Sequence, residues 1–362
     1  MNHWGKRIRA WVVFGVCFAV TLELASRVDQ WVAYGAPILG VYTYDSALFT
    51  TDEFGIRGKP YGQYEKWKLN GLGLRGDDIA LEKPNGRFRV ICVGASETFG
   101  LFEAPGHEWP RQLEADLRLA GRDVEVINGA IAGMTLPQRI RHLQHRLLQL
   151  KPDLVVFMVE YGSYAGLTQE NLVRRRTVRP ELPQREGIVE GLKSIRIVGR
   201  MKDVVLPRLP DVVRDPITRN ERSVRISMQQ RALGKDFRSF VHVRPFEAEI
   251  LERDLGELVT LTEQAGVRLV LTSPAMWFTE RNQTEMYLSW PYLDATWWQE
   301  ARATLPSVVN AFAEKRHIPF VDLSVAVAGR EPELMRDFFH FSDRGAEQVA
   351  GAVARAVSKS VH

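Results

Sequence analysis

From residue 88 onward, short apolar runs alternate with longer stretches in which apolar residues recur every three or four positions. A brief run rich in Val, Ile and Leu is typical of a buried strand, and the longer repeat is typical of an amphipathic helix. The pattern predicts strands at Arg89–Val93, Val124–Ile127, Leu154–Val159, Arg268–Thr272 and Pro319–Leu323, and helices at Trp109–Leu119, Leu136–Leu150, Phe246–Ala265, Ala301–His317 and Gly345–Val357. Strands that alternate with helices predict a mostly parallel sheet with helices on both faces.

The N-terminus carries a different pattern. Lys6, Arg7 and Arg9 precede an apolar run from Ala10 to about Ala25. A basic flank followed by an apolar run is typical of membrane targeting. We expect residues 1–30 to form an uncleaved signal anchor, with its basic end in the cytoplasm and the rest of the chain exported. A cleaved signal peptide and a buried helix of a soluble protein are the alternatives.

Three further segments complete the expected organisation. Residues 31–89 are rich in Gly, Tyr, Phe and charge, and predict a β-rich lead-in that packs against the main domain. Within it, the Asn-Gly-Leu-Gly-Leu-Arg-Gly motif at Asn70–Gly76 predicts turns around an extended piece. Residues 90–362 form the predicted α/β domain, interrupted by an insertion at about 164–243.

The insertion concentrates the positive charge of the chain. Asn171–Lys235 holds 16 Lys and Arg against 7 Asp and Glu. A long segment without clear elements inside a compact fold is often a binding loop or an excursion. It is interpreted either as a basic surface that faces an anionic polymer, anionic lipid headgroups or a protein partner, or as a solvated Arg-rich insertion.

Composition limits the class of protein. The chain has 362 residues, of which 45% are hydrophobic and 25% charged, so a fibrous or disordered protein is excluded. The net charge of +4 is small for this length and indicates no nucleic-acid partner. Cys17 and Cys92 are the two cysteines, which excludes a disulfide framework and a metal site built on cysteines.

Candidate chemistry begins where the first predicted strand of the α/β domain ends. Gly94 and Ala95 lead into Ser96, which is then expected at the carboxyl end of a strand, where open α/β sheets bind ligands. Such a serine becomes a nucleophile if a histidine reaches its hydroxyl. Asp337 and His340, just before the last predicted helix, supply a candidate orienting acid and base. The plainer interpretation is a strand with a small-residue turn, and a packed histidine.

Together these motifs resemble those of the SGNH/GDSL hydrolase superfamily. The resemblance is carried by Gly94-Ala95-Ser96, by Asn128–Gly133 after the next strand, and by Asp337-Phe338-Phe339-His340. The Asn70–Gly76 motif also resembles that of membrane-anchored bacterial members linked to cell-surface polysaccharides. The resemblance implies a flavodoxin-like three-layer α/β/α fold with a parallel sheet, here preceded by one transmembrane helix.

The resemblance also implies roles for individual residues. Ser96 attacks an ester carbonyl, His340 takes and returns the proton, and Asp337 orients the imidazole. The backbone N–H groups of Ser96 and Gly133 face the oxyanion, and each such donor contributes roughly 3 kcal/mol. No cofactor and no metal are implied.

Two positions depart from the family pattern. The usual Gly-Asp-Ser is Gly94-Ala95-Ser96 here. After the third strand the family places Gly-x-Asn-Asp, whose Asn completes the oxyanion hole, whereas this chain has Glu160-Tyr161-Gly162-Ser163. Gly162 falls at the position of the Asn and has no side chain to donate. Loss of one donor costs about a hundredfold in rate.

Aromatic residues cluster between the fourth strand and the next helix. We expect Trp277 and Trp297 to contact a sugar ring, with Trp290, Trp298, Tyr287 and Tyr292 nearby. The alternatives are an aromatic core under a long loop and contact with the membrane interface. By contrast, His142 and His145 lie in Arg139–Arg146, which is expected to be a polar helix surface, so a metal-dependent hydrolase has little support.

The sequence thus predicts a membrane-anchored SGNH-type serine esterase or acyltransferase that acts through an acyl-enzyme on Ser96. Its expected substrate carries O-acyl groups, above all O-acetyl groups, on a cell-surface polysaccharide or other glycan. Its expected location is the inner membrane, with a single span and the catalytic domain on the periplasmic side. The alternative is a catalytically impaired protein of the same fold that serves a polysaccharide system as a glycan-binding or assembly component.

Overall fold

The computed structural model describes residues 3–161, 195–197, 209, 213, 216, 248–279 and 295–358. Its helices are α1 (His3–Tyr34), α2 (Tyr44–Leu48), α3 (Ser96–Phe99), α4 (Trp109–Leu119), α5 (Leu136–His142), α11 (Ala248–Gln264), α13 (Ala295–Lys315), α14 (Leu323–Val327), α15 (Glu331–Leu334) and α16 (Asp343–Val357). Its strands are β1 (Phe49–Asp52), β2 (Gly55–Gly58), β3 (Gln63–Tyr64), β4 (Trp67–Lys68), β5 (Phe88–Val93), β6 (Val124–Asn128), β7 (Leu154–Met158), β8 (Arg268–Thr272) and β9 (Phe320–Val321). The predicted strands and helices of the α/β domain are therefore present, with ends that shift by a few residues.

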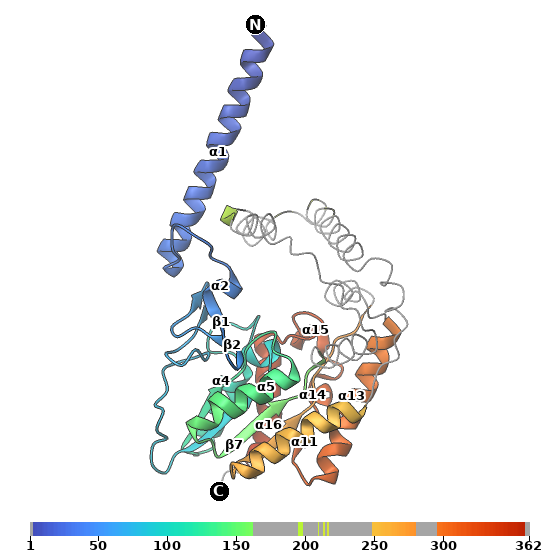
Figure 1. The fold of residues 1–362 in the computed structure, drawn as a ribbon. Helices are drawn as coiled ribbons and strands as arrows, with labels where there is room; N and C mark the ends of the chain where they lie inside the picture. The colour runs from blue at the N-terminus through green and yellow to red at the C-terminus, as the bar shows by residue number, and fades with distance from the viewer. Residues whose placement is uncertain are drawn as a thin grey trace.

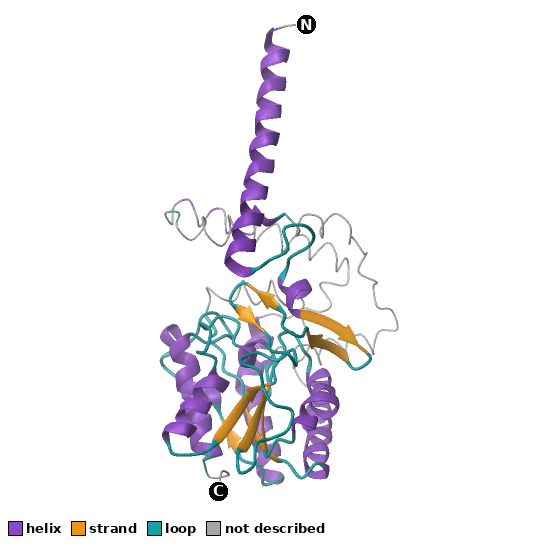
Figure 2. Cartoon of the chain, turned by 90° about the vertical axis from the view of Figure 1, so that its left-hand side faces the viewer, coloured by secondary structure: helices purple, strands orange, loops and turns teal. Residues whose placement is uncertain are grey.

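The core of the α/β domain is a five-stranded sheet in the order β6-β5-β7-β8-β9. Every neighbouring pair in it is parallel, with Val90 opposite Val126 on one side and Leu154 on the other. This is the flavodoxin-like strand order, and helices cover both faces of the sheet (Figure 2). The predicted three-layer α/β/α fold is confirmed.

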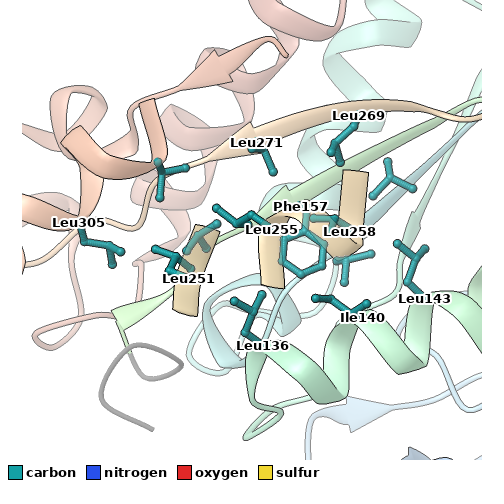
Figure 3. Packing of buried hydrophobic residues seen from close by; sticks show 14 of the residues in the cluster. Leu136, Ile140, Leu143, Phe157, Leu251, Leu255, Leu258, Leu269, Leu271 and Leu305 are labelled. Atoms are coloured by element: carbon teal, nitrogen blue, oxygen red, sulfur yellow. The ribbon is translucent and has the colours of Figure 1, made fainter. Parts of the chain in front are cut away.

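The apolar runs form strands because both sides of each strand are buried. In β5, Ile91 and Val93 pack in the cluster with α5, α11 and α13, whereas Val90 and Cys92 pack in the cluster with α4 and α16. Figure 3 shows the first cluster, in which leucines of α11 meet Phe157 of β7 and the apolar face of α5. Side chains that alternate between two apolar layers leave no polar face, so the runs are continuous rather than alternating.

The helix predicted at Leu136–Leu150 is regular only as far as His142. It continues as a π-helical turn η1 (Leu143–Leu147) and a 3₁₀ turn η2 (Leu148–Leu150). The expectation that Arg139–Arg146 is a polar helix surface is wrong, because Arg139 and His142 are both buried. Arg139 is paired with a buried carboxylate, Glu160, which the sequence pattern alone does not reveal.

The lead-in lies between α1 and the α/β domain (Figure 1). It holds α2 and two small antiparallel sheets, β1-β2 and β3-β4. Its apolar residues form a cluster with Phe99 of α3 and with Ala130, Ile131 and Met134, which follow β6. The lead-in therefore packs against the segment that carries Ser96.

The N-terminal part of α1 projects away from the rest of the molecule (Figure 1), whereas nearer its C-terminal end Glu23 accepts the backbone N–H groups of Arg196 and Ile197, and Gln30 is buried. Arg7–Tyr34 is long and apolar enough to cross a membrane, and its most apolar window is not buried. At 1.5 Å per residue, a helix of this length spans about 42 Å, more than the roughly 30 Å of a bilayer core. Length and composition permit a membrane span, and a signal sequence satisfies the same criteria.

Candidate functional site

The site lies at the carboxyl ends of β5 and β7, where the direction of strand succession reverses. From β5 the chain continues to β6 on one side of the sheet, and β7 then pairs with β5 on the other side. Open α/β sheets bind ligands at this point. Ser96 follows β5 and is the first residue of α3, and Glu160 follows β7.

The turn before Ser96 depends on close packing around Gly94. A Cβ on Gly94 would lie 1.9 Å from Oγ1 of Thr98 and 2.9 Å from Oε1 of Glu160. The same Oε1 accepts a hydrogen bond from the backbone N–H of Ala95. Gly94 therefore leaves room for the carboxylate that holds the residue before the candidate nucleophile.

Asp337 and His340, the candidate orienting acid and base, form a pair in the structure. Nδ1 of His340 lies 2.9 Å from Oδ1 and 2.8 Å from Oδ2 of Asp337. Oδ1 also accepts the backbone N–H groups of Phe339 and His340, at 2.9 and 2.8 Å. These bonds fix the short loop and direct Nδ1–H of the imidazole to the carboxylate, which leaves Nε2 as the basic nitrogen.

The charges around this pair shift both pKa values. Burial raises the pKa of Asp337, but the hydrogen bonds and charge of His340 outweigh it, so the net shift is downward. Burial lowers the pKa of His340, but Asp337, Glu97 and Glu103 together raise it above its ordinary value. Three acidic groups therefore stabilise the imidazolium that a general base becomes during catalysis.

The loops of Ser96 and His340 meet. The ring of Phe102 packs edge-on against the His340 imidazole, with 5.1 Å between centroids. The backbone N–H of Ala104 donates to Asp343 at 2.8 Å, three residues beyond His340. The chain thus brings the two halves of the predicted triad to one edge of the sheet.

The Ser96 hydroxyl donates its hydrogen bond to Glu97 and not to His340 in this structure. Its Oγ donates to Oε2 of Glu97 at 3.1 Å. Nε2 of His340 is buried and has no hydrogen-bond partner among the described residues. The structure therefore places a serine hydroxyl held by one carboxylate and, in the neighbouring loop, a buried ring nitrogen without a hydrogen-bond partner among the described residues.

Sequence reasoning missed three buried carboxylates around this point, namely Glu97, Glu103 and Glu160. Burial raises the pKa of Glu103 to about 7, although its own backbone N–H, Arg75 and His340 oppose the shift. Burial likewise raises the pKa of Glu160, whereas the charge of Arg139 and the hydrogen bond from Ala95 oppose the shift and favour the ionised carboxylate. No sequence signal marked them, because glutamates are usually exposed.

Of the three positions expected at the oxyanion hole, the structure describes Ser96 and Gly133 but not Gly162. Ser96 and Gly133 are both described, and neither amide donates a hydrogen bond to another described residue. Gly133 is exposed and has φ of 82°, a conformation that favours glycine. Gly162, at the position of the expected Asn, lies outside the described residues.

The two tryptophans predicted to contact substrate differ in burial. Trp297 is 2% exposed and packs edge-on against Trp298 at 4.7 Å between centroids, so its face is not open to a sugar here. Trp298 in turn contacts Phe339, beside His340, at 5.5 Å. Trp277 is only partly buried, and its backbone N–H donates to Phe338. Of the two, Trp277 retains exposed surface near the candidate site.

No group of three or more His, Cys, Asp and Glu suited to a metal ion occurs within the described ranges. His142 is buried, and burial together with Arg146 lowers its pKa to about 4. Its Nδ1 lies 3.1 Å from Nη1 of Arg146. In this structure His142 belongs to the packing of α5 against the sheet.

The sequence profile of the GDSL-like Lipase/Acylhydrolase family matches residues 92–348. Among curated proteins, no significant match was found. A lipase/acylhydrolase from Enterococcus faecalis is similar in structure, with 17% identity, a TM-score of 0.43, and coverage of 76% of this chain and 97% of that one.

Two further structures have similar values. A GDSL-like lipase from Bacteroides thetaiotaomicron has 15% identity, a TM-score of 0.38, and coverage of 75% and 88%. An acetylxylan esterase from Geobacillus stearothermophilus, solved as a catalytic mutant, has 16% identity, a TM-score of 0.41, and coverage of 75% and 94%. Similarities this distant carry no argument about substrate or role.

Proposed function

Because the chain belongs to the GDSL-like lipase/acylhydrolase family, we propose that it is a membrane-anchored serine esterase or O-acyltransferase with Ser96 as nucleophile. The family supports ester hydrolysis in general. The observation that carries the assignment of residues is the Asp337–His340 pair, which leaves a buried, basic Nε2 in the loop that meets the loop of Ser96.

The proposed reaction has two halves. The Ser96 hydroxyl turns from Glu97 toward His340, Nε2 takes its proton, and Oγ attacks the ester carbonyl carbon. The tetrahedral intermediate expels the alcohol, which receives the proton from His340, and leaves the acyl group on Ser96. Water or a sugar hydroxyl then gives its proton to His340 and attacks the acyl carbon. The second tetrahedral intermediate expels Oγ of Ser96, which takes the proton back from His340, and releases the acid or the acylated sugar.

The backbone N–H groups of Ser96 and Gly133 are the proposed donors to the negatively charged oxygen of each intermediate. This proposal is supported by the observation that neither N–H group donates a hydrogen bond to another described residue. With Gly162 in place of an Asn, the site has one side-chain donor fewer than the family pattern provides. We therefore expect a slow esterase unless another donor replaces it.

The proposed substrate is an O-acyl group, above all O-acetyl, on a cell-surface polysaccharide or similar glycan. Its support is the resemblance of the Asn70–Gly76 motif and the partly exposed Trp277, because aromatic faces stack on sugar rings. The basic insertion at about 164–243 is the proposed contact for an anionic polymer or a protein partner, and nearly all of it lies outside the described residues.

The proposed location is the inner membrane, with α1 as a single span and the catalytic domain in the periplasm. The exposed apolar surface of α1 and the basic flank of Lys6, Arg7 and Arg9 support it. Fusion of alkaline phosphatase after Val357 tests the orientation. An active phosphatase is expected, and an inactive one would contradict both the location and the surface glycan as substrate.

Catalysis is tested with the full-length protein in detergent and p-nitrophenyl acetate as the ester. Ser96→Ala is expected to lower kcat/KM at least about a hundredfold. Ser307→Ala is the matched control, since Ser307 is an exposed serine on α13. Equal hydrolysis by wild type and Ser96→Ala would exclude Ser96 as the nucleophile.

The second candidate is a glycan-binding or assembly component of the same fold. It is favoured by one observation, namely that the Ser96 hydroxyl bonds to Glu97 rather than to His340. This function predicts that folded wild-type protein hydrolyses no ester and that Ser96→Ala leaves glycan binding and the cellular phenotype unchanged.

A further inference from the structure

The Asn70–Gly76 motif and the rest of the lead-in have no role in the reaction proposed above. Yet the lead-in contacts the loop that runs from Ser96 to Glu103 at several points. We propose that Arg75 and Lys66 of the lead-in position this loop for catalysis, so that the lead-in is part of the catalytic unit. The inference rests on the proposed function of Ser96.

Arg75 binds the end of the helix that begins with Ser96. Its Nη1 donates to the carbonyl oxygens of Phe99, at 2.8 Å, and Gly100. Its Nη2 forms an ion pair with Glu108, and both side chains are less than a tenth exposed. A guanidinium that satisfies carbonyls at a helix end fixes where that helix stops.

Gly100 makes this arrangement sterically strict. It has φ of 81° and terminates α3 in the left-handed conformation. A Cβ there would lie 2.4 Å from Cγ of Glu108 and 3.3 Å from Nη1 of Arg75. The chain therefore turns closely around the Arg75–Glu108 pair, four residues after Ser96.

The motif around Arg75 holds its own shape. Oδ1 of Asn70 accepts the backbone N–H groups of Leu72 and Leu74, each at 3.0 Å, and its Nδ2 donates to Asp77. Gly73 has φ of 75° and lies so close to Gly58 that a Cβ would clash with the Gly58 carbonyl oxygen at 2.3 Å. These hydrogen bonds and the close approach to Gly58 explain the spacing of Asn and Gly in the motif. The motif in turn places the side chain of Arg75 against the end of α3.

Phe99, the last residue of α3, is fully buried among residues of the lead-in. The guanidinium of Arg75 lies 5.0 Å from the centroid of its ring. The rings of Phe49 and Tyr44 lie 6.2 and 6.5 Å away. Both the backbone and the side chain at the end of α3 are thus held by the lead-in.

Lys66 holds the second half of the loop. Its Nζ donates to the carbonyl oxygens of Phe102 and Glu103, at 2.8 and 3.0 Å. Phe102 packs on the imidazole of His340, and the charge of Glu103 raises the pKa of that imidazole. Lys66 therefore positions the part of the loop that packs on His340. Arg75 positions the part of the loop that carries Ser96.

A displacement of about 1 Å of a catalytic group can lower the rate by roughly a hundredfold. Positioning of this kind predicts a fall in kcat with little change in KM, because the contacts do not involve substrate. It also predicts a change in the titration of His340, which is surrounded by Asp337, Glu97 and Glu103. A purely structural role predicts neither effect in protein that remains folded.

The test uses full-length protein in detergent with Lys66→Met, and Lys68→Met as matched control. Lys68 is exposed on the same β3-β4 hairpin. Arg75→Gln paired with Glu108→Gln is the second variant, because it avoids an unpaired buried charge. Thermal unfolding selects conditions in which every variant is folded.

Two readouts are measured. The first is the rate of labelling by a fluorophosphonate, which reports the reactivity of Ser96. The second is the pKa of His340 from NMR of histidine-labelled protein, which requires no activity. Lys66→Met is expected to slow labelling roughly tenfold or more and to change the His340 titration, while Lys68→Met matches wild type.

A negative result for the proposed function can be distinguished from a negative result for the positioning role. If wild type is not labelled, the proposed function fails, and the NMR titration alone decides whether Lys66 acts on His340. If wild type is labelled but folded Lys66→Met and the Arg75/Glu108 variant match it in both readouts, the positioning role is overturned and the proposed function stands.

Discussion

The buried pair of Glu160 and Arg139 provides a prediction whose size follows from the structure. The two side chains are 1% and 0% exposed, with Nη1 of Arg139 3.1 Å from Oε2 of Glu160. The other oxygen of Glu160 accepts the N–H of Ala95. Glu160→Ala therefore leaves a buried guanidinium without its carboxyl partner and a buried amide without its acceptor.

Removal of one partner from a buried ion pair costs about 3–5 kcal/mol, and a buried amide without an acceptor costs about 1–3 kcal/mol. Because these effects share one site and are not additive, we expect Glu160→Ala to lower the free energy of unfolding by about 4 kcal/mol. Against a typical total of about 5–15 kcal/mol, this is a large loss.

The double variant Glu160→Ala/Arg139→Met separates the two contributions. It also removes the guanidinium that had paired with Glu160 and keeps an apolar side chain of similar length against Phe157, whose ring the guanidinium faces at 5.1 Å. We expect it to be more stable than Glu160→Ala by about 3 kcal/mol, with the remaining loss due to the Ala95 amide.

The assay is urea unfolding of full-length protein in detergent, followed by tryptophan fluorescence. Glu333→Ala is the control, because the Arg330–Glu333 pair is 54% and 41% exposed and its loss is expected to change little. If Glu160→Ala is as stable as wild type, or if the double variant is no more stable than the single one, the ion pair does not hold the turn before Ser96.

Three further predictions concern the site and its surroundings. Asp337→Asn keeps the loop but no longer holds the imidazole in the required tautomer, so kcat for p-nitrophenyl acetate is expected to fall roughly a thousandfold or more at unchanged Tm; a smaller loss than tenfold would contradict the role of Asp337. Glu97→Gln removes a charge that raises the pKa of His340, so the acidic limb of the kcat/KM profile is expected at lower pH, whereas an unmoved or higher limb would contradict the electrostatic account. For His142, whose pKa is lowered to about 4, the unfolded chain takes up a proton near pH 6.5 and the folded chain does not, so stability is expected to fall by roughly 3 kcal/mol as the pH drops from 6.5 to 4. His142→Gln is expected to flatten this dependence in urea unfolding, and an unchanged slope would assign it to other groups.

The strands and most helices were predictable because their signal is local. Helix Trp109–Leu119 and strand Arg268–Thr272 match the sequence pattern residue for residue. Parallel strands buried on both faces read as continuous apolar runs, and the alternation with helices sets the layers. The place of Ser96 followed from the same logic, because it comes directly after the first predicted strand of the sheet. Asp337 and His340 were expected from the motif before the last helix and the resemblance it carries, and their catalytic roles stay a prediction.

What sequence reasoning missed depends on contacts between distant residues. Arg139 lies on a helix with other basic residues, and only the carboxylate of Glu160 at the end of β7 explains why it is buried. In the same way, Arg75 pairs with Glu108, 33 positions later, around the turn at Gly100. A buried charge is compensated by a partner that the local pattern does not identify.

The central claim is that Ser96 is a nucleophile activated by His340 and Asp337. It is tested most directly by treating full-length protein with a fluorophosphonate and locating the adduct by mass spectrometry of peptides. We predict a single adduct on Ser96 that is absent from Ser96→Ala and formed far more slowly in His340→Ala. Folded wild-type protein that carries no adduct on Ser96, or that is modified equally fast without His340, would contradict the claim.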